Sequence, residues 1–270
     1  MRVMVRANPQ AYKNQWPEVE VAVADALNID HLKDALNGVD VAYYLIHSLC
    51  LGPKDFESTD KKVADNFASA AAEKKVKRII YLGGLGNVSS YLSHHLSSRI
   101  DVAIRLIMGE VRVTTLRAAV IVGSGSASYE IVYHLVKRLP VLLVPPWAKS
   151  MCQPIAVRDV IKYLVGVLEV SETAEKYFDI GGEDVLTYEN MLKIFAKILD
   201  RKIIFIPAPF NNTEFYAYFT SLIAPPPYAL VKCLIESLQN DAVCQDNSIR
   251  NFLPFDPISY TGSIIEALRR

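Results

Sequence analysis

The chain has 270 residues, 51% of them hydrophobic and 21% charged, which is the composition of a folded protein of one large or two modest domains. Its 29 basic and 29 acidic side chains cancel, so nucleic acid is excluded as an expected partner. No uncharged apolar run reaches the roughly 18 residues that a membrane span needs, and the four cysteines show no metal-binding CxxC spacing. We therefore expect a cytoplasmic protein with no membrane span and no metal site.

Short runs rich in Val, Ile and Tyr alternate with amphipathic stretches in the first half of the chain. The short runs predict five strands, and apolar residues at helical spacing predict two helices between them. The expected strands are 2–6, 19–23, 39–46, 78–82 and 112–122, and the expected helices are 28–36 and 58–75. This alternation is typical of parallel strands joined by crossover helices and predicts an α/β protein.

The alternation weakens after residue 123, where several prolines interrupt an apolar stretch. Beyond this point the pattern predicts helices at 159–169 and 187–199 and strands at 176–180 and 202–206. We therefore expect residues 1–123 to form one domain and residues 124–270 a C-terminal substrate-side lobe that is interleaved with it.

Polar residues follow the first three predicted strands, at the carboxyl edge where a doubly wound sheet binds ligands. Arg6 is suited to pair with an adenosine 2′-phosphate, although a solvated surface arginine fits this position equally well. Asp25 either meets an adenine amino group or caps the helix that begins near Asn28. His47 is a candidate proton donor or cofactor contact, with a purely structural histidine as the more frequent alternative.

Two glycine-rich turns follow the next two strands, at residues 83–86 and 123–125. Glycines remove side chains where a backbone or a flat ligand must approach, so the two turns together favour a cleft. His95 and Arg99 lie four residues apart on one face of a predicted helix, where the cation favours a neutral imidazole suited to proton transfer. A solvated helix end is the alternative, and nothing beside His94 and His95 supports a metal site.

The ordered set of these segments resembles the atypical short-chain dehydrogenase/reductases, and the NmrA-like NAD(P)H-binding proteins in particular. The segments are 3–6, 24–25, 38–40, 77–86, 114–117, 154–160 and 178–182. The resemblance implies a Rossmann-type doubly wound parallel sheet with a small C-terminal α+β lobe, and NADP as cofactor in preference to NAD. It also implies cofactor contacts for Arg6 (2′-phosphate), Asp25 (adenine), Ile46 and His47 (ribose side) and Gly83 and Gly84 (nicotinamide side).

The sequence departs from this family pattern at its start. The family begins with a strand, a Gly-x-x-Gly-x-x-Gly turn and a helix that hold the pyrophosphate. This sequence starts where the next strand is expected and has no glycine before Gly38. We therefore expect an N-terminally incomplete domain with impaired cofactor binding, and aggregation or a homodimer that fills the gap in the sheet.

A second departure concerns the catalytic residues. Where the family carries a serine and a Tyr-x-x-x-Lys pair, this sequence has Gly83, Gly84 and His95-x-x-x-Arg99, and Tyr91 lies one turn too early. The main hypothesis is a reductase that uses NADPH on an unknown small carbonyl or enone, with His95 or His47 as the acid and Arg99 as the ribose-binding cation. The alternatives are a non-catalytic NAD(P)H-sensing regulatory protein and a truncated family member.

Overall fold

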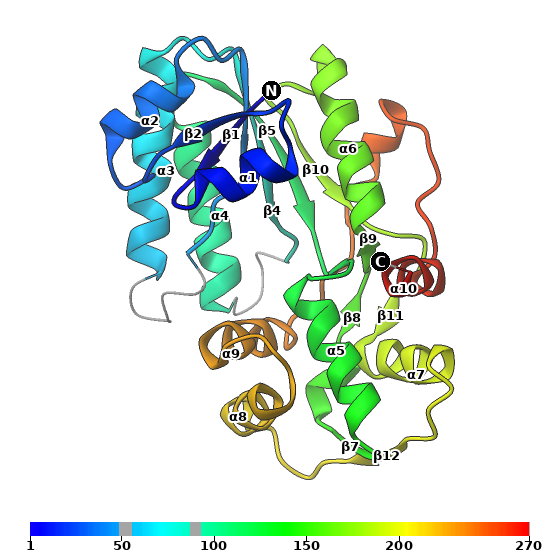
Figure 1. The fold of residues 1–270 in the computed structure, drawn as a ribbon. Helices are drawn as coiled ribbons and strands as arrows, with labels where there is room; N and C mark the ends of the chain where they lie inside the picture. Colours follow the sequence, from blue (N-terminus) through cyan, green and yellow to red (C-terminus); the bar gives the residue numbers. More distant parts are fainter. Residues whose placement is uncertain (49–55, 87–92, 270) are drawn as a thin grey trace.

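The computed structural model describes residues 1–48, 56–86 and 93–269, and its centre is a four-stranded parallel sheet (Figure 1). The order across the sheet is β10 (Tyr177–Ile180), β5 (Arg112–Ala118), β4 (Arg78–Gly84) and β3 (Val41–Tyr44). Every neighbouring pair in it is parallel, with β4 and β5 paired along seven residues. The expected α/β class with a parallel sheet is confirmed.

A second, two-stranded parallel sheet contains β1 (Arg2–Val5) and β2 (Glu20–Val23). Within the described ranges, β1 pairs with β2 alone and β3 pairs with β4 alone, so the two sheets share no backbone ladder. Side chains connect them instead: Met4 packs against the core beside β3. The guanidinium of Arg2 donates to the carbonyls of Ala35 and Asn37, at 2.8 Å each.

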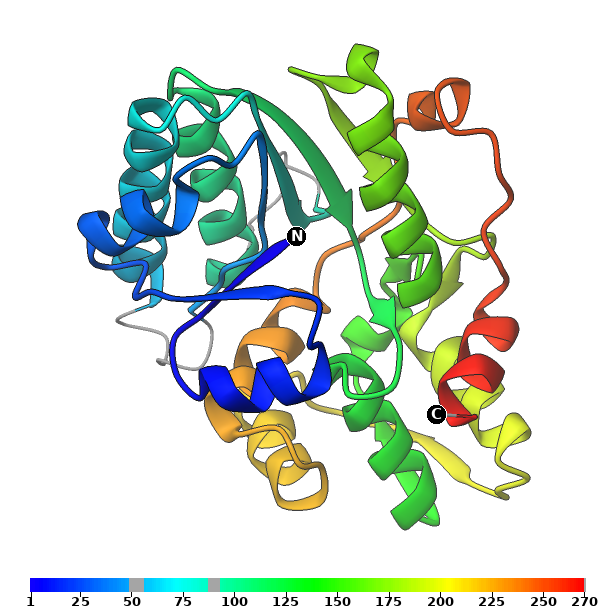
Figure 2. The same ribbon diagram turned by 45° about the horizontal axis from the view of Figure 1, so that its top comes forward.

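Helices cover both faces of the central sheet (Figure 2). On one face α3 (Phe56–Glu73) packs between α2 (Ile29–Leu36) and α4 (His94–Ile107), over a core that includes Tyr44, Ile79 and Tyr81. On the other face α6 (Val157–Glu169) covers Ile80, Leu116 and Phe178. The residues of β4 therefore alternate between two buried cores, as a central parallel strand requires.

Most residues beyond 123 build a smaller layer below the sheet, whereas α6 covers one face of the sheet and β10 returns to pair with β5 (Figure 1). This layer contains the parallel pair β7 (Val141–Val144) and β12 (Ile204–Pro207). The other elements of the chain are α1 (Pro9–Gln15), β6 (Ile121–Val122), α5 (Ala127–Arg138), β8 (Met151–Cys152), β9 (Ile155–Ala156), β11 (Leu186–Thr187), α7 (Tyr188–Ile198), α8 (Thr213–Ile223), α9 (Tyr228–Ser237) and α10 (Tyr260–Leu268). The domain boundary at residue 123 stays a prediction.

The expected strand 112–122 is wrong as one element, because the chain forms two strands there. The carbonyl of Ala118 accepts from Leu85 N, whereas the carbonyl of Val120 accepts from Ile155 N. The chain thus leaves the central sheet after Ala118 and pairs with β9 through β6. The other expected strands and helices are present with ends shifted by a few residues.

Among the helices that the structure describes, none has both the length and the apolar character needed to cross a lipid bilayer.

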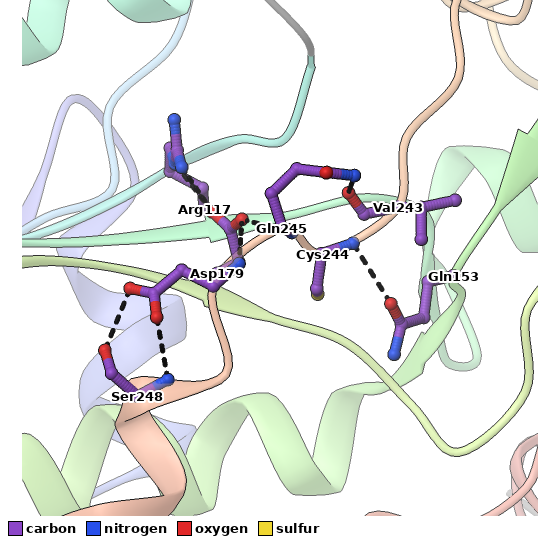
Figure 3. A network of polar contacts seen from close by, with 8 residues as sticks. Arg117, Gln153, Asp179, Val243, Cys244, Gln245 and Ser248 are labelled. Atoms are coloured by element: carbon purple, nitrogen blue, oxygen red, sulfur yellow. Dashed lines mark hydrogen bonds and ion pairs between the residues drawn. The ribbon is translucent and has the colours of Figure 1, made fainter.

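An ion pair between a half-buried arginine and a buried carboxylate joins β5 and β10 to the segment 243–248 (Figure 3). Nε and Nη2 of Arg117 lie 2.7 and 2.6 Å from the same oxygen of Asp179, whose carboxylate is fully buried. The second oxygen of Asp179 accepts from the backbone N–H groups of Gln245 and Asp246. Each lone-pair direction of the buried carboxylate thus has a donor, which offsets its loss of hydration.

We expect Asp179→Asn to lower the free energy of unfolding by about 1–3 kcal/mol, because its buried amide NH2 would meet other donors and the partly exposed Arg117 would lose its counter-ion. Asp40→Asn is the matched control, since the Asp40–Lys77 pair is exposed by 73% and 70% and contributes well under about 1 kcal/mol. Urea denaturation of the two variants checks this difference. Equal losses would contradict the role given to the buried pair.

Candidate functional site

A cavity of about 410 Å³ lies at the carboxyl ends of β3, β4 and β5. Its wall is largely apolar and includes Leu82, Leu85 and Leu96 on the sheet side. Leu234 and Leu238 face it from the segment of α9, which lies below this edge of the sheet in Figure 1. This is the place where open α/β sheets bind their ligands, at the junction with a second layer.

The structure brings five of the predicted site residues into the wall of this one cavity. They are His47, Gly83, Gly84, His95 and Arg99. Ile46 contributes through its backbone carbonyl, which accepts from Arg99 Nη1 at 3.1 Å. Arg6 and Asp25 follow β1 and β2 and are not among the cavity's described lining residues.

The two glycines of β4 leave the strand end narrow where it meets the cavity. A Cβ atom at Gly83 would lie 3.0 Å from the ring of Tyr81, and one at Gly84 would lie 3.1 Å from Leu96. A larger residue at either position would therefore need Tyr81 or Leu96 to shift by a few tenths of an ångström, so packing within the chain favours small residues here. In the second glycine turn, a Cβ atom at Gly123 would lie 2.6 Å from Val157, and Gly123 is not among the described lining residues.

Arg99 holds the ends of two strands together beneath the cavity. Its Nη2 donates to the carbonyl of Leu82 at 2.7 Å, and its Nη1 donates to that of Ile46. The guanidinium lies 4.9 Å from the centroid of the Tyr81 ring, and the Tyr81 hydroxyl donates to the Arg99 carbonyl. The buried cation is thus stabilised by two carbonyls and an aromatic face.

Both histidines of the cavity wall favour the neutral imidazole. Burial lowers the pKa of His95 to about 4, and the charges of Arg99 and His47 act in the same direction. The pKa of His47 is also lowered, first by partial loss of hydration and then by Arg99, although Asp60 opposes this and the side chain keeps an exposed edge. Two neutral imidazoles therefore face the cavity at pH 7.

Two serines that sequence reasoning missed complete the surroundings of His95. Nδ1 of His95 lies 3.3 Å from Oγ of Ser237 at the end of α9. Oγ of Ser93 lies 2.9 Å from Oγ of Ser237. Ser93 is also the N-cap of α4, where its Oγ accepts from Leu96 N. The capping position gave a sequence signal for Ser93, whereas Ser237 is 142 residues from His95 and gave none.

Sequence reasoning also missed Asp60, a buried carboxylate on α3. Its two oxygens accept from the backbone N–H of Ser48 at 2.9 Å and from the hydroxyl of Ser98 at 3.1 Å. These bonds hold the chain that follows His47 against α3 and α4. The segment that contains Tyr91 lies outside the described residues.

The residues expected at the adenosine side lie at the ends of the small sheet. Arg6 is exposed just beyond β1. Asp25 is half-buried, and its Oδ1 accepts from Leu27 N at 3.0 Å in a turn before α2. Asn28, rather than Asp25, is the N-cap of this helix.

The first 132 residues contain every strand of the cavity's sheet side, and they match the family model described as NAD(P)H-binding. The N-terminal part of this chain is thus similar to NAD(P)H-binding domains. The classification expected from the sequence motifs, among the atypical short-chain dehydrogenase/reductases, fits this match and the fold. No curated protein sequence matches the chain.

Solved structures share the fold across almost the whole chain. A nucleoside-diphosphate-sugar epimerase from Staphylococcus aureus is 16% identical, with 98% of this chain and 90% of that one covered and a TM-score of 0.78. Triphenylmethane reductase from Citrobacter sp., complexed with NADP(H), is 14% identical, with 98% and 90% covered and a TM-score of 0.75. An NADPH-dependent quinone oxidoreductase from Escherichia coli, complexed with NADPH, is 16% identical, with 99% and 90% covered and a TM-score of 0.75. At these identities the likeness shows a shared fold.

The low pKa of His95 predicts a loss of stability in acid. Between pH 6.5 and about 4 the unfolded chain binds a proton at this histidine that the folded chain does not, so the free energy of unfolding falls as the pH is lowered. The contribution approaches about 3 kcal/mol across this range. We expect His95→Gln to remove that part of the slope in urea denaturation followed against pH, and the slope to persist in His94→Gln, which leaves His95 in place. Identical slopes in wild type and His95→Gln would be evidence against the buried neutral imidazole.

Proposed function

We propose that this chain is an oxidoreductase that binds NADP(H) and acts on a small carbonyl or enone compound. The observation that carries the proposal is the meeting of Gly83, Gly84, His47, His95 and Arg99 around one cavity at the carboxyl edge of an NAD(P)H-binding sheet. Its volume of about 410 Å³ and its largely apolar wall fit a nicotinamide ring together with a small substrate.

Each residue has a distinct role in this proposal. Gly83 and Gly84 leave room for the nicotinamide, which supplies or accepts the hydride when the cofactor is bound. His95 or His47 exchanges a proton with the substrate oxygen. Arg99 keeps the ends of β3 and β4 together and presents the remaining face of its guanidinium to the ribose, beside the Ile46 carbonyl that it binds.

The adenosine end of the cofactor is assigned to the small sheet. Arg6 is exposed and forms no hydrogen bond or ion pair with the other described residues, so its guanidinium is available for a 2′-phosphate. Asp25 retains Oδ2 for the adenine amino group, since only Oδ1 is engaged in the turn. This assignment predicts that NADPH binds more tightly than NADH.

Titration of the purified protein with NADPH and NADH, followed by calorimetry, tests this part of the proposal. We expect NADPH to bind at least about tenfold more tightly than NADH, and Arg6→Ala to abolish this preference, because a charge-assisted contact to a phosphate contributes about 1.5–3 kcal/mol. Arg112→Ala is the matched control, since Arg112 is exposed at the opposite, amino end of β5. Failure of both cofactors to bind at millimolar concentration would contradict the proposal and favour a family member with impaired cofactor binding.

A non-catalytic NAD(P)H-sensing role is the second candidate, and the state of two phenols favours it. Burial raises the pKa of Tyr81 to about 12, and its hydroxyl is engaged by the Arg99 carbonyl. The pKa of Tyr188, which also lines the cavity, is raised well above its ordinary value by burial. Neither phenol is therefore suited to act as the proton donor of a reductase.

Oxidation of NADPH in the presence of a panel of aldehydes, ketones and enones separates the two candidates. A reductase turns over at least one of them and loses activity in His95→Ala. A sensor binds NADPH as tightly as a reductase would, but NADPH is not oxidised with any compound of the panel.

A further inference from the structure

The imidazole of His95 is bound on one edge by a residue from the other half of the chain. Its Nδ1 lies 3.3 Å from Oγ of Ser237, which is the last residue of α9. Ser237 and His95 both line the cavity. A contact between α4 and α9 thus decides how the ring is held at the ligand site.

The other bonds of Ser237 decide the direction of this contact. Its hydroxyl donates to the carbonyl of Cys233 at 2.9 Å, one turn earlier in α9. A serine hydroxyl has one proton but two lone pairs, so Oγ is left as an acceptor for His95 and for Ser93, whose Oγ is 2.9 Å away. Oγ of Ser93 accepts from Leu96 N in the helix cap, which leaves the Ser93 proton for Ser237. The proton of the neutral imidazole therefore belongs on Nδ1.

The second ring nitrogen of His95 is not engaged by the part of the chain that the structure describes. Nε2 has no hydrogen-bond partner among the described residues. It is also absent from the fully buried polar atoms of these residues that lack a partner. Because His95 is part of the cavity wall and Nδ1 is engaged by Ser237, Nε2 is the ring nitrogen left for a ligand there. The ring is neutral at pH 7, since its pKa is about 4.

We infer that Ser237 is a positioning residue that holds His95 as the Nδ1–H tautomer, so that Nε2 offers a lone pair to the cavity and selects ligands with a hydroxyl or N–H donor. The apolar residues around it, among them Leu85 and Leu234, exclude water from this bond and favour a donor carried on an apolar body. The site thus takes a hydroxylated apolar molecule, such as a phenol or a secondary alcohol.

This inference extends the proposed function by naming the alcohol, and not the carbonyl compound, as the substrate that binds to the neutral site. The assignment of a substrate rests on the proposed function. In the oxidation of a secondary alcohol, the O–H bond breaks and its proton forms an N–H bond at Nε2. The C–H electron pair leaves as hydride to an oxidised nicotinamide dinucleotide, and the carbon–oxygen bond becomes a carbonyl. Reduction is the reverse of this sequence and requires the ring protonated at Nε2, so carbonyl reduction through His95 is favoured below pH 7.

The tautomer is measured directly on the protein alone, by long-range ¹H–¹⁵N correlation of the histidine rings at pH 7. We expect Nε2 of His95 to show the shift of an unprotonated nitrogen in wild type and in Ser237→Thr, which keeps the hydroxyl. In Ser237→Ala the Nε2–H tautomer gains population. Ser263→Ala is the matched control, since Ser263 on α10 donates to the carbonyl four residues earlier in the same way. A protonated Nε2 in the wild type would overturn the inference, whether or not the cofactor binds.

Phenol and anisole form a matched pair of probes for the ligand class, because the methyl ether has the same ring but no donor. We expect phenol to bind at least fivefold more tightly than anisole and to move the Nε2 resonance of His95. Ser237→Ala should remove this preference while circular dichroism shows an unchanged fold, and Ser237→Thr should restore it. Equal affinities of the two probes for the wild type would contradict selection by a donor. Failure of NADPH binding, in contrast, would count against the proposed function and leave both results in place.

Discussion

The guanidinium of Arg99 is the contact on which the arrangement of the cavity depends. A buried cation is costly unless it is bonded, and Arg99 meets this cost with the carbonyls of Ile46 and Leu82 and the ring of Tyr81. These bonds fix the first turns of α4 against the ends of β3 and β4. The position of His95 follows from them, and the nearby positive charge adds to burial in lowering its pKa.

The cavity belongs to both halves of the chain. The first half supplies Gly83 and Gly84 from β4 and His95 and Arg99 from α4, whereas the segment of α9 supplies Ser237, Leu234 and Leu238. The ion pair between Arg117 and Asp179 ties β10, which comes from the second half, into the sheet of the first. Under the proposed function, a shift of α9 would therefore alter both the cavity wall and the contact between Ser237 and His95.

Strand and helix positions in the first half were predictable because each element has a clear apolar period. Two of the missed helices, α1 and α8, lack that signal. On α8, Phe215 and Leu222 are exposed while Tyr216 and Ala217 are buried, so apolar residues lie on both faces and form no single stripe. All of α1 is outside the core, and it follows Asn8, which has a positive φ of 54°. The separation of β5 from β6 depends on which backbone groups pair, and composition does not encode this.

The sequence alone determined the α/β class, the resemblance to NAD(P)H-binding proteins and the helical face that His95 and Arg99 share, because these properties depend on residues that are near neighbours in the chain. It also placed His47, Gly83 and Gly84 at strand ends. Only the tertiary structure decided that these residues share a cavity while Arg6 and Asp25 lie on a separate sheet. It alone showed Ser237 beside His95 and the bonds that Arg99 makes, since both result from the packing of segments that are far apart in the sequence.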